Sequence, residues 1–234
     1  MAKIAKVNFN PNKISANPEK SFYIFTQKIM KLNQQGKNID LSRFSKELYQ
    51  LGDSFEAKNQ KELMNKKAKK LAETLVAKND NNMAGIIYSF LIKFNQENTK
   101  LVEEFATSAL AIAKRLNDPM HVMARCNDLK EIYKTFPPKE DKLLKVLYEE
   151  KRALNKIITD YDNVKTKYNT INRQMKPVSN YRILLADIKF EIGKQLTNKD
   201  EKLAMQEIAE ARAIYEEYKL TNRLASLEEF IGNK

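Results

Sequence analysis

Apolar residues recur three or four positions apart along almost the whole chain, and this spacing constrains the fold more than any other feature. Residues at these intervals share one side of an α-helix, so each run predicts a helix with one buried face. The runs are Phe22, Phe25, Ile29 and Leu32; Leu41, Phe44, Leu48, Leu51 and Phe55; Met64, Ala68, Leu71 and Leu75; Val102, Phe105, Ala109, Ile112 and Leu116; Val122, Cys126, Leu129, Ile132 and Phe136; Tyr181, Leu184, Ile188 and Ile192; and Ala204, Ile208, Ala211, Tyr215 and Tyr218. No segment requires a β-strand, so the sequence predicts an all-α protein.

Helix start signals precede several of these runs. Asn17 is a good N-cap, Pro18 suits the first helical position, and Glu19 complements the positive end of the helix dipole. Similar start signals are Asp40, Asp118 with Pro119, Pro177 and Asp200. The polar stretches AKNDNN, FNQENT, TFPPKED and LTNKD predict short turns, so consecutive helices are expected to be closely joined.

The composition agrees with this fold class. Hydrophobic residues make up 42% of the 234 residues, enough for one elongated domain or two small ones with a core. The chain has 5 Gly, 6 Pro and no Trp, unlike turn-dense all-β proteins. The single cysteine, Cys126, cannot form an internal disulfide and falls on a helix face expected to be buried, which suits a reducing compartment.

We expect a soluble, cytoplasmic protein. No segment approaches the roughly 20 apolar residues of a membrane span, and the stretch MAKIAKVNFNPNK lacks the apolar run of a signal peptide. Residues 1–16 are expected to form an extended lead-in, with Val7 and Phe9 as a hydrophobic anchor. Residues 17–234 are expected to form one helical repeat domain of about four helix pairs plus an N-terminal helix.

The helical segments are related by internal repetition. A shift of about forty residues places Leu71 and Leu75 on Ile112 and Leu116, and Tyr88 and Leu91 on Leu129 and Ile132. A further shift places Ala211, Ala213 and Ile214 on Ala109, Ala111 and Ile112. Periods of this length are typical of stacked helix pairs. Ala109 and Ala113 would lie where two helices approach, so their small size is expected to be a packing requirement.

The stretch ALAIAKRLNDPMHVMARCNDLKEIY resembles the junction of second helix, Asp turn and first helix in tetratricopeptide repeats, especially the longer variety of kinesin light chains and bacterial peptide-sensing regulators. Leu51-Gly52 and Ile231-Gly232 are similar to the Leu-Gly pair of that family, in which the small residue lets two helices approach. The resemblance covers about residues 40–231 and is weak at 141–176. It implies a right-handed α-solenoid of antiparallel helix pairs, and the alternative is a helical bundle without repeats.

Residues 141–173 break the period. They carry apolar residues from Leu144 to Ile171 without an internal Gly or Pro, which predicts one unusually long helix of about 50 Å. A turn hidden near Asp160 is the first alternative. A projecting arm that recruits a partner is the second, although Lys151 interrupts the apolar seam that a coiled coil would keep.

Residues that carry catalysis are scarce. His121, the only histidine, lies at the start of a helix, where a role in the turn is favoured over that of a general base. Cys126 is expected to pack as a small hydrophobe. Adjacent glutamates such as Glu149 and Glu150 point in different directions on a helix, so we interpret them as solvated rather than as a metal or acid–base pair. Phosphate-binding glycine loops are absent. The sequence therefore predicts no enzyme, no cofactor and no metal site.

The chain is basic, with 42 Lys and Arg against 30 Asp and Glu and a net charge of +12. Most of these cations are Lys, whereas nucleic-acid contacts favour Arg, so a solvated surface is the simpler interpretation. The run NKKAKKLAE nevertheless predicts a basic amphipathic helix that can meet phosphates or an acidic protein; its cations are Lys66, Lys67, Lys69 and Lys70. Tyr148, Tyr161, Tyr168 and Tyr181 lie at core spacing and are interpreted as packing residues.

The resemblance to tetratricopeptide repeats implies a non-catalytic scaffold that binds a protein or peptide in a concave groove lined by first helices. Arg125, Asn127 and Lys130 match the groove positions best, with Lys93 as a weaker candidate. Their positive charge would favour an acidic or carboxylate-ended partner. Two alternatives stay open. One is binding of nucleic acid or an anionic surface through the four lysines at 66–70. The other is a structural subunit of a larger assembly, which would expose an apolar strip on residues 141–173.

Overall fold

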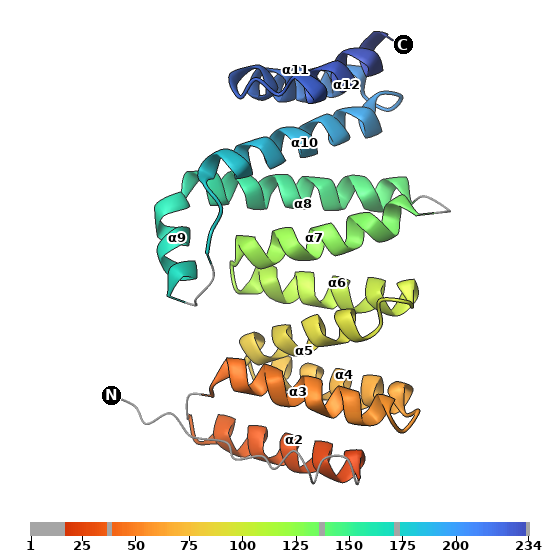
Figure 1. Cartoon of the computed structure of the whole chain (residues 1–234), viewed down its shortest axis with the longest axis vertical. Helices are drawn as coiled ribbons and strands as arrows, with labels where there is room; N and C mark the ends of the chain where they lie inside the picture. The colour runs from red at the N-terminus through yellow and green to blue at the C-terminus, as the bar shows by residue number, and fades with distance from the viewer. Residues whose placement is uncertain (1–16, 37–38, 136–138, 171–173, 233–234) are drawn as a thin grey trace. The chain divides into compact units, whose positions relative to one another are not determined.

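The computed structural model describes residues 17–36, 39–135, 139–170 and 174–232. Within these ranges the secondary structure consists of eleven α-helices without a strand (Figure 1). Their bounds are α2 (Pro18–Gln34), α3 (Leu41–Glu56), α4 (Lys61–Ala77), α5 (Asn81–Phe94), α6 (Thr99–Arg115), α7 (Pro119–Lys134), α8 (Glu140–Thr159), α9 (Tyr161–Asn169), α10 (Val178–Leu196), α11 (Glu201–Glu217) and α12 (Thr221–Gly232). The all-α class predicted from the apolar spacing is confirmed. The expected lead-in at 1–16, with Val7 and Phe9, lies outside the described residues, as do Phe136 and Ile171.

Side-chain caps explain where many helices begin. Four predicted caps, Asn17, Asp40, Asp118 and Asp200, each accept a backbone N–H of the first turn. Asp80 and Asn98 cap α5 and α6 in the same way. These oxygens satisfy donors that a helix leaves without an internal partner, so the start of each helix is encoded locally.

Three helix ends share one turn geometry, which reflects the repetition seen in the sequence. The residue in the left-handed region is Asn59 (φ 56°), Asn79 (φ 59°) or Lys219 (φ 53°). In each turn the next residue donates its N–H five residues back, from Gln60 to Phe55, Asp80 to Leu75 and Leu220 to Tyr215, at 2.9 Å. This bond satisfies carbonyls at the end of the helix and reverses the chain toward the next one.

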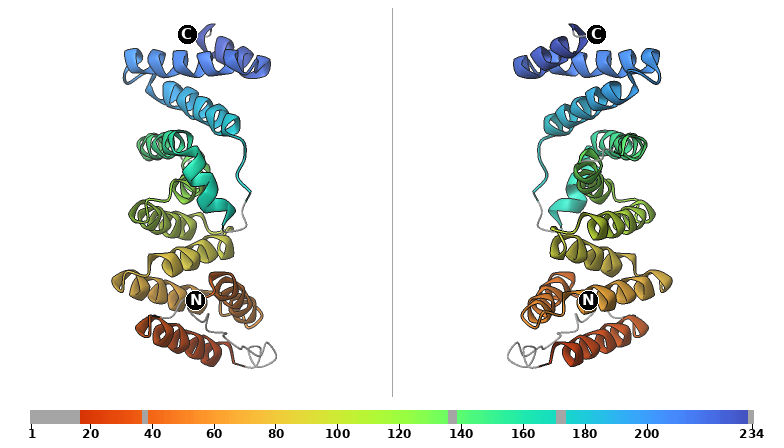
Figure 2. Two further views of the ribbon diagram at one scale, coloured as in Figure 1. Left: turned by 90° about the vertical axis from the view of Figure 1, so that its left-hand side faces the viewer. Right: turned by 90° about the vertical axis from the view of Figure 1, so that its right-hand side faces the viewer.

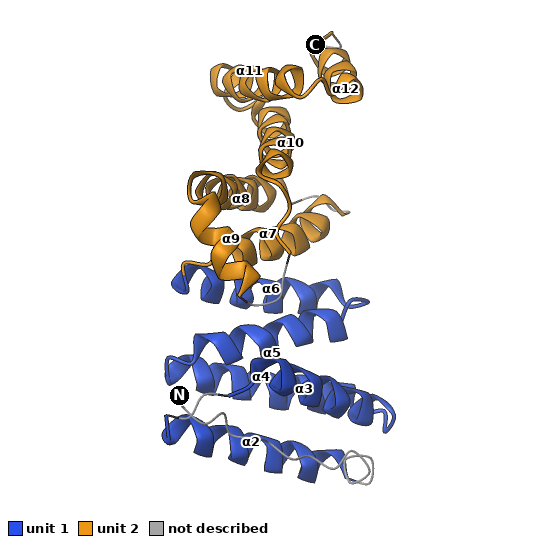
Figure 3. Ribbon diagram, turned by 60° about the vertical axis from the view of Figure 1, so that its left-hand side comes forward, with its two compact units in different colours: residues 1–116 blue, residues 117–234 orange. Residues whose placement is uncertain are grey.

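The chain forms two compact units, residues 1–116 and 117–234 (Figure 3). In the first unit, α3 and α4 form one antiparallel pair and α5 and α6 another, while α2 packs on α3 and α3 packs against α5. Figure 2 shows α3 and α4 on opposite sides of this unit. Contacts of this kind, within a pair and between equivalent helices of neighbouring pairs, characterise an α-solenoid.

The core of the first unit is aromatic and closely packed. The rings of Phe25 and Phe44 stack with centroids 5.3 Å apart, joining α2 to α3. A Cβ atom on Gly52 would lie 2.8 Å from the ring of Phe90, so this glycine lets α3 and α5 approach, as its Leu-Gly pair predicts. At Gly232 nothing lies within 4 Å of such an atom, so the same prediction is wrong there.

The second unit contains the pairs α7–α8 and α10–α11, with α8 packed directly on α10 and α12 on α11. Its last three helices bury Ala186, Ile208, Ala211, Tyr215 and Leu227 in one cluster. In both units each helix pair packs directly on the next, since α4 packs on α5 as α8 packs on α10, so the described chain is an all-α solenoid of helix pairs. The prediction of one repeat domain over 17–234, like the handedness of the array, stays a prediction.

The prediction of a single long helix over residues 141–173 is wrong. The chain leaves helical geometry at Asp160 (φ −102°, ψ 26°), between α8 and α9, where the alternative placed a hidden turn. Hydrogen bonds continue on both sides, since Asp160 donates to Lys156 and Val164 donates to Asp160, each at 2.9 Å. Val164 and Tyr168 of α9 are buried, and the Tyr168 hydroxyl binds Asp118 at 2.7 Å. Tertiary contacts of α9 therefore favour the change of direction.

Candidate functional site

Two first helices of the first unit share an exposed surface, the α3–α5 face. It consists of Lys46, Tyr49 and Asp53 on α3 and Asn82, Ile86, Ser89 and Lys93 on α5, each set at helical spacing and none buried. The Tyr49 ring meets Phe90 edge-on at 5.2 Å, and the Lys93 ammonium lies 5.4 Å from the Tyr49 ring centroid. Contact between Tyr49 and Lys93 therefore joins the exposed rows of the two helices.

The candidates on α7 are not brought together on one face. Arg125 forms an ion pair with Asp128 on its own helix at 3.2 Å. Lys130 binds Glu150 of α8 at 2.7 Å, and both side chains are largely buried. Asn127 is exposed. Because residues two apart on a helix point in nearly opposite directions, Arg125 and Asn127 flank different sides of α7.

Glu150 corrects the interpretation of the adjacent glutamates as solvated. It is 5% exposed, and burial raises the pKa of its carboxyl group, an effect that nearby Lys130 opposes. The sequence held a signal for this position, since Leu147, Glu150 and Leu154 lie on the same apolar stripe of α8. The positive charge of Lys130 is thus compensated within the chain.

A second set of buried charges joins α8, α10 and α11. Glu207 is 3% exposed and lies 3.5 Å from the ammonium of Lys189, which is itself 6% exposed. Lys151 donates to Glu207, and Lys189 donates to Glu210. Lys151, which was predicted to interrupt the apolar seam, therefore forms an ion pair between helices. The sequence did not indicate its partner, Glu207, which is 56 residues away.

The lysines of the basic run on α4 divide into two groups. Lys67 pairs with Glu19 of α2 at 3.4 Å, and Lys69 pairs with Glu104 of α6 at 2.5 Å. Lys66 and Lys70 are exposed and have no acidic partner among the described residues. Half of the predicted patch therefore joins α4 to α2 and to α6, and half faces solvent.

His121 lies in the first turn of α7, where its Nδ1 is 2.9 Å from Oδ2 of Asp118. Burial raises the pKa of Asp118, but hydrogen bonds from His121 and Tyr168 lower it by more, so the carboxylate stays ionised. Together the three side chains fasten α9 to the start of α7. This places His121 in the turn, as the sequence predicts, and Tyr168 and Tyr181 are buried packing residues.

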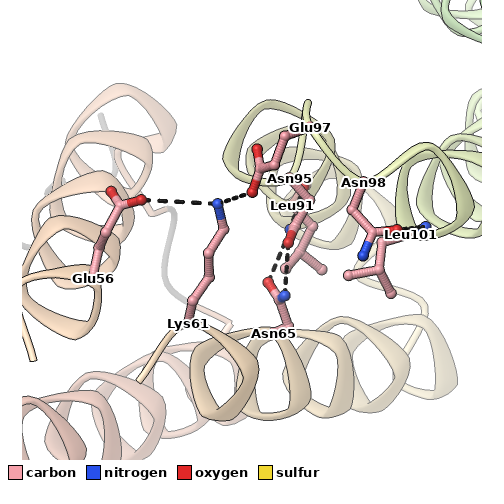
Figure 4. A network of polar contacts seen from close by, with 8 residues as sticks. All are labelled: Glu56, Lys61, Asn65, Leu91, Asn95, Glu97, Asn98 and Leu101. Atoms are coloured by element: carbon pink, nitrogen blue, oxygen red, sulfur yellow. Dashed lines mark hydrogen bonds and ion pairs between the residues drawn. The ribbon is translucent and has the colours of Figure 1, made fainter. Parts of the chain in front are cut away.

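Polar side chains also fasten the α5–α6 turn to α4 (Figure 4). Asn65 and Asn95 exchange two amide hydrogen bonds at 2.7 and 2.9 Å, although both are buried. Lys61 lies between Glu56 and Glu97 and above the ring of Phe94. Each group satisfies another within the chain, so we interpret this network as structural.

The remaining candidates for a ligand, metal or catalytic site are a pocket, clusters of possible metal ligands and Cys126, and none of them forms such a site among the described residues. A small hollow between α2 and α3 is lined by Arg43 and the buried Glu47, and it is too small to hold an ordinary ligand. Over the described ranges, no group of three or more His, Cys, Asp or Glu residues can hold a metal ion. Cys126 is fully buried, as predicted. No helix of the described part is long and apolar enough to cross a membrane.

A structural subunit was expected to expose an apolar strip on residues 141–173. For the described part of this segment, that prediction is wrong. The apolar residues of α8 and α9 are mostly buried, and the exposed large hydrophobics of the described chain lie elsewhere. They are Tyr23, Ile24, Leu41 and Met205.

No family model matches the sequence, and no curated protein matches it. Among solved structures, the chain is similar to BtubC (BKLC) from P. vanneervenii, with 11% identity over 91% of this chain and 93% of that one, at a TM-score of 0.30. It is also similar to the de novo designed helical repeat protein DHR64, with 14% identity over 94% and 100% of the two chains and a TM-score of 0.30. Similarity at these values does not indicate a function or a partner.

Proposed function

We propose that this chain is a non-catalytic scaffold of tetratricopeptide-like helix pairs that binds a protein or peptide on the α3–α5 face. The observation that carries the proposal is the junction of Tyr49 and Lys93 across two first helices. It puts an aromatic ring and an ammonium group side by side on a surface whose other members, apart from Ile86, are polar. Beneath this junction the ring of Phe90 packs closely on Gly52, and close packing of this kind lowers the cost of ordering a binding face.

The charge of this face favours an acidic segment. Lys46 and Lys93 have no acidic partner within the described ranges, and Asp53 is the one carboxylate among the residues of the face. A partner carboxylate can accept from either ammonium group, while an apolar side chain packs on Tyr49. We therefore propose an acidic or carboxylate-ended peptide as the partner.

The α7 candidates contribute less to this proposal. Lys130 and Arg125 already face acidic residues, so their charge is available only at the cost of an internal ion pair. Reversing Lys130 would also place a second carboxylate beside the buried Glu150 and would disturb the fold. Charge reversal at Lys46 and Lys93 is the sharper test, because both side chains are exposed.

The experiment selects peptides from a displayed library on the purified chain and measures the affinity of the best sequence by fluorescence anisotropy. We expect an acidic consensus, and a loss of about tenfold in affinity for Lys46→Glu with Lys93→Glu and for Tyr49→Ala. Lys202→Glu, an exposed change on α11, is the matched control and should bind as the parent does. Unchanged affinity in both test variants would remove the α3–α5 face as the site.

A further inference from the structure

The outward side of α2 carries an unusual combination of side chains, which we call the α2 outer stripe. Its members follow one another at helical spacing and are all exposed: Lys20, Tyr23, Ile24, Gln27 and Lys31. Tyr23 is 63% exposed and Ile24 is 49% exposed, more than any other large hydrophobic residue of the described chain. Two adjacent apolar side chains thus project into solvent between two lysines.

Packing inside the first unit does not require these two side chains. The buried face of α2 is formed by Phe22, Phe25 and Ile29, which meet α3 through the ring contacts of Phe44 and Phe55. Tyr23 and Ile24 point away from that face because they are offset from it around the helix. Their exposure leaves apolar area in contact with water, which a partner could remove.

The charges around the stripe are positive and uncompensated. Lys20 and Lys31 have no acidic partner in the described part of the chain, whereas the one acidic residue of α2, Glu19, is held by Lys67. That ion pair also joins α2 to α4, which carries the exposed Lys66 and Lys70. Glu62 and Glu73 are exposed on α4, but α2 presents no free carboxylate.

We propose that the α2 outer stripe binds the surface of an anionic lipid bilayer, with α2 lying among the headgroups. Tyrosine prefers this interface because its ring is apolar and its hydroxyl is polar, and Ile24 can reach the acyl boundary. The flanking lysines keep their ammonium groups level with lipid phosphates and carboxylates. The association is weak and reversible, since two apolar side chains supply little buried area.

The same residues fit a nucleic acid less well. The described α2 has no arginine for bidentate phosphate contacts, and Tyr23 is its one exposed ring, so successive bases have no series of aromatic side chains on which to stack. Because the stripe lies on α2 and the α3–α5 face on other helices, the membrane proposal does not depend on the peptide-binding one.

The absence of tryptophan from the sequence permits a direct test. Tyr23→Trp introduces a lone tryptophan at the centre of the stripe, and Met205→Trp introduces one at an exposed apolar position of α11 as a control. Each variant of the full chain is titrated with vesicles of phosphatidylcholine alone and of phosphatidylcholine with phosphatidylserine. We expect the emission of Tyr23→Trp to shift to shorter wavelength with the anionic vesicles, while Met205→Trp does not respond.

Co-sedimentation of the parent chain with the same vesicles supplies the affinities. Tyr23→Ser with Ile24→Ser should lower the affinity for anionic vesicles about tenfold, and Lys20→Glu with Lys31→Glu should lower both the affinity and its dependence on salt. The controls Met205→Ser and Lys202→Glu should bind as the parent does. The proposal is overturned if the parent does not sediment with anionic vesicles, or if neither test variant weakens binding. It is also overturned if a single-stranded RNA shifts the Tyr23→Trp emission at lower concentration than lipid does.

Discussion

Asn65 and Asn95 bind each other through both of their side-chain amides, at 2.7 and 2.9 Å, in the interior of the first unit (Figure 4). The Asn95 amide also donates to the carbonyl of Leu91 at 2.8 Å. Asn65→Ala removes the partner of a buried amide, so we expect a loss of about 1–3 kcal/mol in the free energy of unfolding. Urea unfolding measures this loss. Asn82→Ala, at an exposed position of α5, should change stability by less than about 0.5 kcal/mol.

Two helical glycines should respond in opposite ways to alanine. At Gly52 the new Cβ atom would lie 2.8 Å from the buried ring of Phe90, so Gly52→Ala should cost about 1–3 kcal/mol through overpacking. At Gly85 the nearest atom is Ile112 Cγ2 at 3.6 Å, an ordinary contact, and alanine should stabilise the helix by about 0.4–1 kcal/mol. Melting curves of the two variants compare them directly. Equal melting temperatures would contradict the close approach of α3 and α5.

A size requirement is also expected at Ala109, which is 4% exposed on α6. Ala109→Leu should destabilise the chain by about 1–3 kcal/mol, because a buried position without spare volume must rearrange around three extra carbons. Ala111→Leu, on the exposed side of the same helix, is the matched control and should melt with the parent. The prediction fails if the two variants melt together.

Stability in acid should depend on Asp118. Its pKa is lowered in the folded state, so its carboxylate stabilises the fold above the ordinary unfolded value of about pH 4. That stabilisation is lost as the pH falls through the folded-state pKa. Asp118→Asn should therefore melt below the parent at neutral pH, and the difference should begin to narrow below about pH 4 and go on narrowing as the pH falls further. Asp53→Asn, at an exposed position of α3, should keep the acid response of the parent.

The Arg223 side chain should hold α12 against α10 and α11. Its guanidinium donates to both oxygens of Asp187 at 2.7 and 3.0 Å, and Tyr215 donates to the same carboxylate at 2.9 Å, so one group joins α10, α11 and α12. We expect Arg223→Ala to speed amide hydrogen exchange in residues 221–232. Arg223→Lys should give an intermediate rate because it keeps the charge and loses the bidentate geometry. Protection equal to that of the parent would show that apolar contacts alone hold α12.

The positions of most helices could be predicted from the sequence, because their signals act over a few residues. Asn17 and Asp118 cap helices with oxygens that reach only the next turn, and the apolar stripe of each segment decides which side is buried. The close approach of two helices at Gly52 could also be predicted, since such an approach leaves no room for a side chain. The same reasoning failed at Gly232, where no neighbouring helix approaches.

The candidate site depends on contacts between residues far apart in the sequence, and these contacts could not be predicted from the sequence. Lys69 could be recognised as part of a basic run, but its pairing with Glu104, 35 residues away, is decided by the packing of α4 beside α6. Lys130 is similarly paired with Glu150 and is not a free cation. The segment expected to be one long helix bends at Asp160, and Tyr168 beyond the bend binds Asp118. Helical periodicity specifies which face of each segment is apolar. Which charges remain free on the surface is decided only when the helices stack, because an ion pair needs two side chains that the chain brings together from far apart.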